Sequence, residues 1–164
     1  MRAATISQVK NELKTLSHKD LMDKCIRLAK YKKENKELLT YLLFEADNEK
    51  LYIQSIKEEV DLLFEDINRD SMYYIKKSLR KILRYTNKFI KYSGIKRTEV
   101  ELLIYYCQKI KESEIAIQHS TALLNIYFRQ YQKIQKAISF LHEDLQYDFG
   151  KELEALKLED NYYL

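Results

Sequence analysis

The sequence predicts an all-α fold, and three observations support this prediction. The chain of 164 residues contains no proline and only two glycines, Gly94 and Gly150. Both residue types are costly inside helices and common in tight turns. Apolar residues recur at steps of three and four along nearly the whole chain, whereas strict alternation is almost absent. A chain with these properties packs helices together and has little use for hairpins.

The first third of the chain predicts three helices. Four apolar residues spaced by three and four indicate the first one: Ile6, Val9, Leu13 and Leu16. Ser17, with Asp20 three residues later, is typical of a helix start, and the second helix is expected to run to about Tyr31. Residues 32–35 are the expected connector. The third helix, over 36–46, is apolar nearly all round, which predicts a place in the middle of the fold.

The middle of the chain predicts two longer helices. Asp47 or Asn48 is the expected cap of a helix that ends near Ile67. Asn68 or Asp70 is expected to open the next helix, which runs to about residue 93. Gly94 follows where a left-handed C-terminal cap belongs, so this is the clearest helix end in the sequence.

The last part of the chain predicts a short helix and a long one. Thr98 and Glu101 have the spacing of a capping box, which predicts a helix from there to about Glu112. A regular seam with steps of three and four then follows, as in heptad repeats. Its members are Ile117, Ser120, Leu124, Tyr127, Tyr131, Ile134, Ile138, Leu141 and Leu145. The seam fits one helix of about 28 residues from Ser113 or a shorter one from Ser120, and we favour the longer.

Short connectors predict that successive helices pack antiparallel as neighbours. Seven or eight helices are therefore expected in a single domain over residues 1–164. A HEAT-like α-α superhelix and a closed multi-helix bundle both satisfy this pattern. The segment 37–43 also resembles the segment 101–107, which would fit a duplicated three-helix unit with an offset of 64 residues.

The sequence lacks the features of exported or membrane-spanning proteins. The N-terminal residues contain no apolar run like that of a signal peptide, and no run approaches the roughly 20 apolar residues that cross a bilayer. Cys25 and Cys107 each fall on the apolar side of a predicted helix, so we interpret both as small buried hydrophobes, not as disulfide partners. A cytoplasmic protein is the expectation.

No catalytic apparatus is recognisable, so the sequence predicts a protein that is not an enzyme. None of the three histidines, His18, His119 and His142, completes a Glu-x-x-His or His-Glu-x-x-His motif. Two glycines cannot form a phosphate-binding loop of the usual types. We therefore expect no catalytic residue, no metal site, no cofactor and no small-molecule substrate.

One segment has a strong charge bias. Residues 71–98 contain no acidic residue and nine basic ones. Five of the basic residues are spaced by three and four, so on a helix they lie within about 40° of one line and form a ridge about 20 Å long. This basic ridge comprises Lys77, Lys81, Arg84, Lys88 and Lys91, and Lys96 and Arg97 follow it. Its expected ligand is an anionic partner. Tyr74, Tyr85 and Tyr92 are expected along one edge.

Several interpretations of the basic ridge remain open. It could be a solvated outer face, or it could pair with the acidic segment 45–66 of the preceding helix. The functional hypothesis is a protein-interaction or scaffold module, with a protein as the expected partner. The alternative is a nucleic-acid-binding protein that uses the ridge, with tyrosines stacking on bases. Self-association through the 117–145 seam is a further hypothesis, and no membrane partner is expected.

Overall fold

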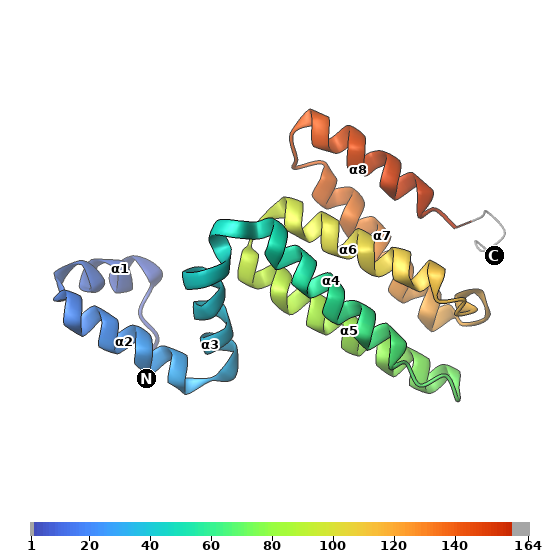
Figure 1. Cartoon of the computed structure of the whole chain (residues 1–164). Helices are drawn as coiled ribbons and strands as arrows, with labels where there is room; N and C mark the ends of the chain where they lie inside the picture. The colour runs from blue at the N-terminus through green and yellow to red at the C-terminus, as the bar shows by residue number, and fades with distance from the viewer. Residues whose placement is uncertain (1, 159–164) are drawn as a thin grey trace. The chain divides into compact units, whose positions relative to one another are not determined.

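The computed structural model describes residues 2–158, which form eight α-helices and contain no strand (Figure 1). The all-α prediction and the expected number of helices are confirmed. Contacts divide the chain into two compact units, residues 1–44 and 45–164, a division that the prediction of one domain over 1–164 did not anticipate. Each unit is described below by itself.

The first unit contains α1 (Ile6–Thr15), α2 (His18–Tyr31) and α3 (Lys33–Thr40). The starts of α1 and α2 each have a local cause. The Thr5 hydroxyl accepts a hydrogen bond from the amide of Gln8, and the Gln8 side chain accepts one from the amide of Thr5, which forms a capping box. The Ser17 hydroxyl accepts from the amide of Asp20, so the predicted cap of α2 is confirmed.

The connector between α2 and α3 is shorter than expected. Lys32 alone interrupts the helices in an extended conformation, with φ −143° and ψ 149°. A π-helical stretch over Tyr41–Glu45 and a short 3₁₀ turn over Ala46–Asn48 follow α3. The expected central position of 36–46 is wrong: Leu42, Leu43 and Phe44 are 56%, 61% and 78% exposed.

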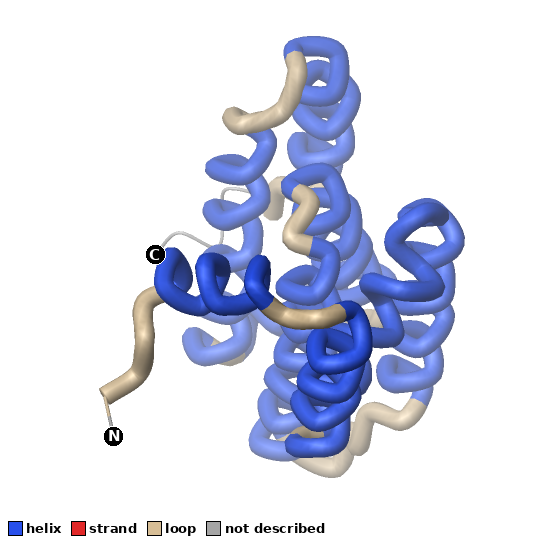
Figure 2. The backbone as a smooth tube through the Cα atoms, turned by 90° about the vertical axis from the view of Figure 1, so that its left-hand side faces the viewer, coloured by secondary structure: helices blue, strands red, loops and turns tan. Residues whose placement is uncertain are grey.

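The second unit contains five helices joined by short loops (Figures 1 and 2). They are α4 (Glu49–Glu65), α5 (Met72–Ser93), α6 (Lys96–Glu112), α7 (Thr121–Ile138) and α8 (Glu143–Ala155). The helix α6 packs against the other four helices. This unit is therefore a bundle built around α6. Eight side chains of α6 are buried: Thr98, Val100, Leu102, Leu103, Ile104, Tyr106, Cys107 and Ile110.

Residues close to the helix ends cap α4 and α5. Asn48 caps α4 through its side-chain oxygen, which accepts from the amide of Leu51 at 3.2 Å, as predicted. Ser71 caps α5, so the caps predicted for this helix, Asn68 or Asp70, are wrong. Gly94 ends α5 in the left-handed conformation, with φ 67°, and its amide donates to the carbonyl of Ile90.

The capping box predicted at Thr98 and Glu101 is wrong. Helix α6 begins two residues earlier, at Lys96, and both side chains contact α4 instead. The Thr98 hydroxyl donates to the carboxylate of Glu49, and the Glu101 carboxylate lies 2.8 Å from the ammonium of Lys57. Long-range partners have therefore displaced the local cap.

The long helix predicted from Ser113 is also wrong. The shorter alternative is confirmed at its start, Ser120, but the predicted continuation to Leu145 is wrong. Helix α7 ends at Ile138, and α8 begins after a loop in which His142 is the N-terminal cap. The buried members of the seam, which include Tyr127 and Ile134, lie in the core of this unit. The Tyr127 hydroxyl donates to the carbonyl of Leu156 beyond the end of α8. These seam positions therefore serve intramolecular packing.

The two cysteines and the two similar segments have different surroundings. Cys107 is fully buried in α6, as predicted, and burial raises the pKa of its thiol to about 12. Cys25 is exposed on α2, so its predicted burial is wrong; both thiols are free. Segment 101–107 lies in the centre of α6, whereas 37–43 runs from α3 into the π-helical stretch. Their duplication stays a prediction.

Gly94 provides a test of the α5 end. We expect Gly94→Ala to lower the free energy of unfolding by about 1 kcal/mol, because a Cβ atom is strained at φ 67° even though no atom lies within 4 Å. The matched control is Gly150→Ala inside α8, where nothing lies within 4 Å and φ is not positive. Gly150→Ala is expected to raise the free energy of unfolding by about 0.5–1 kcal/mol, because alanine favours a helix more than glycine does. Urea unfolding of both variants measures the difference, and equal shifts would contradict this account.

Candidate anion-binding ridge

Helix α5 has a buried face and a basic face. Five of its side chains are buried against the rest of the bundle: Ile75, Leu79, Ile82, Thr86 and Ile90. On the other side Lys77, Lys81, Arg84 and Lys91 are exposed, and Lys88 is half-buried. The spacing of three and four that separates these sets in the sequence separates them in the structure as well.

Two tyrosine hydroxyls fix the rotation of α5 about its own axis. The hydroxyl of Tyr106 on α6 donates to the carbonyl of Leu79 at 3.0 Å, and this bond is buried. The hydroxyl of Tyr52 on α4 donates to the carbonyl of Phe89 at 2.9 Å. A buried hydroxyl without a partner is costly, so these bonds resist rotation of α5. The basic face is therefore held toward solvent.

Asp61, an acidic residue of α4, contacts two side chains of α6. The Asp61 carboxylate accepts from the Tyr105 hydroxyl at 2.6 Å and lies 2.9 Å from the ammonium of Lys109. Within residues 2–158, none of the exposed ridge cations Lys77, Lys81, Arg84 and Lys91 forms an ion pair. The interpretation that the acidic segment 45–66 neutralises the ridge is therefore wrong for these four residues.

The N-terminal end of the ridge is hollowed. A surface hollow of about 290 Å³ is lined by Tyr73, Lys76, Lys77, Arg80 and Arg84. Lys76 and Arg80 belong to the nine basic residues of 71–98, but the ridge predicted from the sequence does not include them. Their spacing could have placed them in the ridge. Lys76, Arg80 and Arg84 are each four residues apart, so on a helix their side chains point in similar directions.

The tyrosines predicted along one edge do not form one continuous surface. Tyr74 is 44% exposed and stands edge-on to the 62% exposed Tyr73, with ring centroids 5.4 Å apart. Tyr85 and Tyr92 instead pack against Phe89, with centroids 4.7 Å and 5.5 Å from its ring. Highly exposed rings are therefore confined to the N-terminal end of α5.

The two basic residues after the ridge have different environments. Lys96 is the first residue of α6, and its ammonium lies 2.7 Å from the Glu99 carboxylate. Lys133 on α7 lies 3.1 Å from the same carboxylate, so Lys96 belongs to an ion-pair cluster between α6 and α7. Arg97 is exposed and forms no ion pair within the described part of the chain. Arg97 is thus the more available of the two.

The pKa shifts of the acidic groups follow from these contacts. Burial acts to raise the pKa of Glu99, but hydrogen bonds and attraction from Lys96 and Lys133 outweigh it and hold the pKa below its usual value. Asp61 behaves in the same way: burial opposes ionisation, and the bonds from Tyr105 and Lys109 lower its pKa. Both carboxylates are therefore stabilised in the charged form by structural partners.

The described residues 2–158 contain no group of histidine, cysteine and acidic side chains that could hold a metal ion. No helix among them is long and apolar enough to cross a membrane. Comparison with protein-family models, curated proteins and solved structures finds no match to this chain. Its function is therefore inferred from its own residues.

The Glu99 cluster predicts a pH-dependent contribution to stability. Because the folded-state pKa of Glu99 lies below its usual value of 4.5, the stabilisation is present above that value and is lost as the pH falls through the lower folded-state pKa. We expect Glu99→Gln to lower the free energy of unfolding by about 1–2 kcal/mol at pH 7. The difference from the unchanged protein should shrink toward pH 3. Urea unfolding at both pH values measures it.

The control for this experiment is Glu59→Gln, because Glu59 is exposed on α4. Its effect should stay within about 0.5 kcal/mol at either pH. A Glu99→Gln effect of the same size at pH 7 and pH 3 would show that the lost charge is not the cause.

Proposed function

We propose that this chain is a non-enzymatic protein-interaction module whose basic ridge binds an acidic protein surface. The observation that carries this proposal is that Lys77, Lys81, Arg84 and Lys91 are exposed and form no ion pair within residues 2–158. Four cations without intramolecular partners on one face of a fixed helix create a positive potential that attracts anionic partners. The hydroxyl bonds to Leu79 and Phe89 support the proposal, because they hold this face in place before a partner arrives.

The spacing of the ridge favours a protein partner. Cations separated by three and four residues rise by about 4.5–6 Å along the helix axis. Carboxylates on an acidic helix repeat with the same spacing, so several pairs can form at once. The proposed partner is therefore an acidic helical surface that lies along α5.

Nucleic acid is the second candidate, and one observation favours it. Tyr73 and Tyr74 are exposed at the end of the ridge, and the Lys76 ammonium lies 6.0 Å from the centroid of the Tyr73 ring. A base could stack on such a ring while the neighbouring cations contact phosphates. The packing of Tyr85 and Tyr92 against Phe89 limits this mode to one end of α5, which is why it ranks second.

The buried polar groups of the bundle have structural partners. Within the described residues, no buried side-chain nitrogen or oxygen lacks a hydrogen-bond partner. The buried hydroxyls of Tyr106 and Tyr127 illustrate the structural use of these groups, since each donates to a backbone carbonyl of another part of the bundle.

Charge reversal on the ridge tests the proposal. The triple variant Lys77→Glu, Lys81→Glu, Arg84→Glu should bind labelled poly-L-glutamate at least about tenfold more weakly than the unchanged protein at about 50 mM salt. The reason is that exposed cations supply the attraction, which salt screens. Fluorescence anisotropy measures binding, and far-ultraviolet circular dichroism verifies that helicity is kept.

A matched control separates ridge binding from general charge. The variant Arg129→Glu, Lys136→Glu, Lys151→Glu changes the net charge equally at exposed positions on α7 and α8. It should reduce binding only slightly. Equal losses in both triple variants would contradict the proposal. Tighter binding of a single-stranded oligonucleotide than of poly-L-glutamate, lost on Tyr73→Ala, would favour the second candidate.

A further inference from the structure

The three helices of the first unit are amphipathic but bury no side chain. Large apolar residues on α1 and α2 remain substantially exposed: Ile6 84%, Val9 41%, Leu13 40%, Leu28 61% and Tyr31 75%. Apolar surface in contact with water costs free energy, and contiguous patches of this kind mark binding sites. The first unit therefore presents an apolar face that no part of residues 2–44 covers.

This apolar face is concave between α1 and α2. A hollow of about 600 Å³ opens there. Its lining consists of Val9, Leu13, Lys24, Arg27, Leu28, Lys30 and Tyr31. An apolar floor with polar groups at its edge is the usual form of a helix-binding groove.

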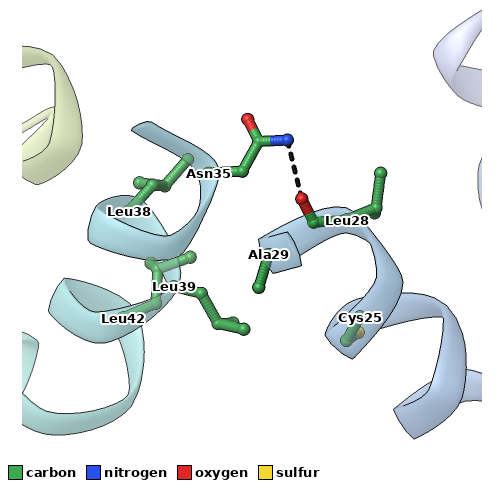
Figure 3. Close-up of a pocket in the computed structure, with 7 residues that line it drawn as sticks. All are labelled: Cys25, Leu28, Ala29, Asn35, Leu38, Leu39 and Leu42. Carbon is green, nitrogen blue, oxygen red and sulfur yellow. Dashed lines mark hydrogen bonds between the residues drawn. The ribbon is translucent and has the colours of Figure 1, made fainter. Parts of the chain in front are cut away.

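A second hollow continues the apolar face between α2 and α3. It has a volume of about 250 Å³ and is lined by Cys25, Leu28, Ala29, Asn35, Leu38, Leu39 and Leu42 (Figure 3). The Asn35 amide donates to the carbonyl of Leu28 at 2.9 Å and so ties α3 to α2. Leu28 lines both hollows, and together they form what we call the N-terminal groove.

The charge of the groove indicates the chemistry of its occupant. Lys24, Arg27 and Lys30 line the groove, and no acidic residue does. Residues 1–44 carry ten basic and five acidic side chains, whereas residues 45–164 carry 19 and 20. The excess positive charge of the chain is thus concentrated in the unit that contains the groove. An occupant with carboxylates beside an apolar stripe complements both properties.

We propose that the N-terminal groove binds an acidic amphipathic helix of a partner protein, with the apolar stripe of that helix placed on Leu28. The carboxylates of the helix would pair with Lys24, Arg27 and Lys30. A concave groove suits a rod such as a helix, whereas an anionic bilayer is bound by an apolar face that lies flat on the surface. This site is separate from the basic ridge and does not depend on the function proposed for it.

The test uses two labelled peptides with the full chain. Both are 18-residue peptides with leucines at steps of three and four, which form an apolar stripe when the peptide is helical; one carries glutamate at the remaining positions and the other carries lysine. Fluorescence anisotropy should show that the glutamate peptide binds at least about tenfold more tightly than the lysine peptide. Equal binding of the two peptides, or no binding of the glutamate peptide, would overturn the proposal.

Two variants test the groove itself. In the background of the ridge variant Lys77→Glu, Lys81→Glu, Arg84→Glu, which removes binding of the peptide to the basic ridge, Leu28→Asp should weaken binding of the glutamate peptide at least about tenfold. The control Leu62→Asp on α4, with a leucine 57% exposed, should not weaken it in that background. The triple variant Lys24→Glu, Arg27→Glu, Lys30→Glu should reverse the preference and bind the lysine peptide more tightly. That reversal distinguishes a binding role from a structural one, and circular dichroism verifies that helicity is kept. Unchanged binding by Leu28→Asp would overturn the proposal.

Other occupants give different results. Sedimentation that shows a dimer of the unchanged protein and a monomer of Leu28→Asp would assign the groove to a second copy instead. Binding to phosphatidylserine vesicles that depends on Leu28 would assign it to a membrane. Failure of the ridge proposal is distinguishable, because Leu28→Asp should keep its binding to poly-L-glutamate, and the ridge variant should keep its Leu28-dependent binding to the glutamate peptide.

Discussion

The burial of α6 is the constraint on which the second unit depends. This helix packs against four others, so its apolar and polar side chains must both be satisfied by neighbours. Apolar residues such as Leu103 and Val100 supply the burial energy without fixing a direction. The buried Tyr106 hydroxyl is directional, and by donating to Leu79 it selects one rotation of α5. A requirement in the interior thereby decides which residues of α5 face solvent.

The same constraint distributes the charges of the bundle. Because α4 and α6 pack together, Lys57 pairs with Glu101 across them, and Lys109 pairs with Asp61. These pairs use acidic groups that the sequence places close to the basic ridge in the chain. The exposed ridge cations are left without such partners, since no acidic residue lies within 71–98 to pair with them along the helix. The exposed ridge cations Lys77, Lys81, Arg84 and Lys91 therefore form no ion pair within the described residues for two reasons: their own segment has no acidic residue, and Asp61 and Glu101 are used in pairs between α4 and α6.

Features set by neighbouring residues could be predicted from the sequence. Ser17, Asn48 and Gly94 act within four residues of themselves, and the structure confirms all three. Thr98 is not a cap, because α6 begins two residues earlier and the Thr98 hydroxyl donates to Glu49, which is 49 positions away. The ridge was visible because charge periodicity is local, whereas the pairing of Lys57 on α4 with Glu101 on α6 joins residues 44 positions apart. Local spacing does not carry such long-range information.

The segment 36–46 shows why an apolar pattern alone cannot name its partner. A helix that is apolar nearly all round must be covered, and a single chain usually supplies the cover itself. Here Leu42 and Leu43 stay exposed, and α1, α2 and α3 bury no side chain. Forty-four residues are too few to enclose a core without help. The pattern that predicted a central helix fits equally well a helix that is covered by a surface outside this unit. Our proposal that this surface is acidic rests on the cations beside Leu28.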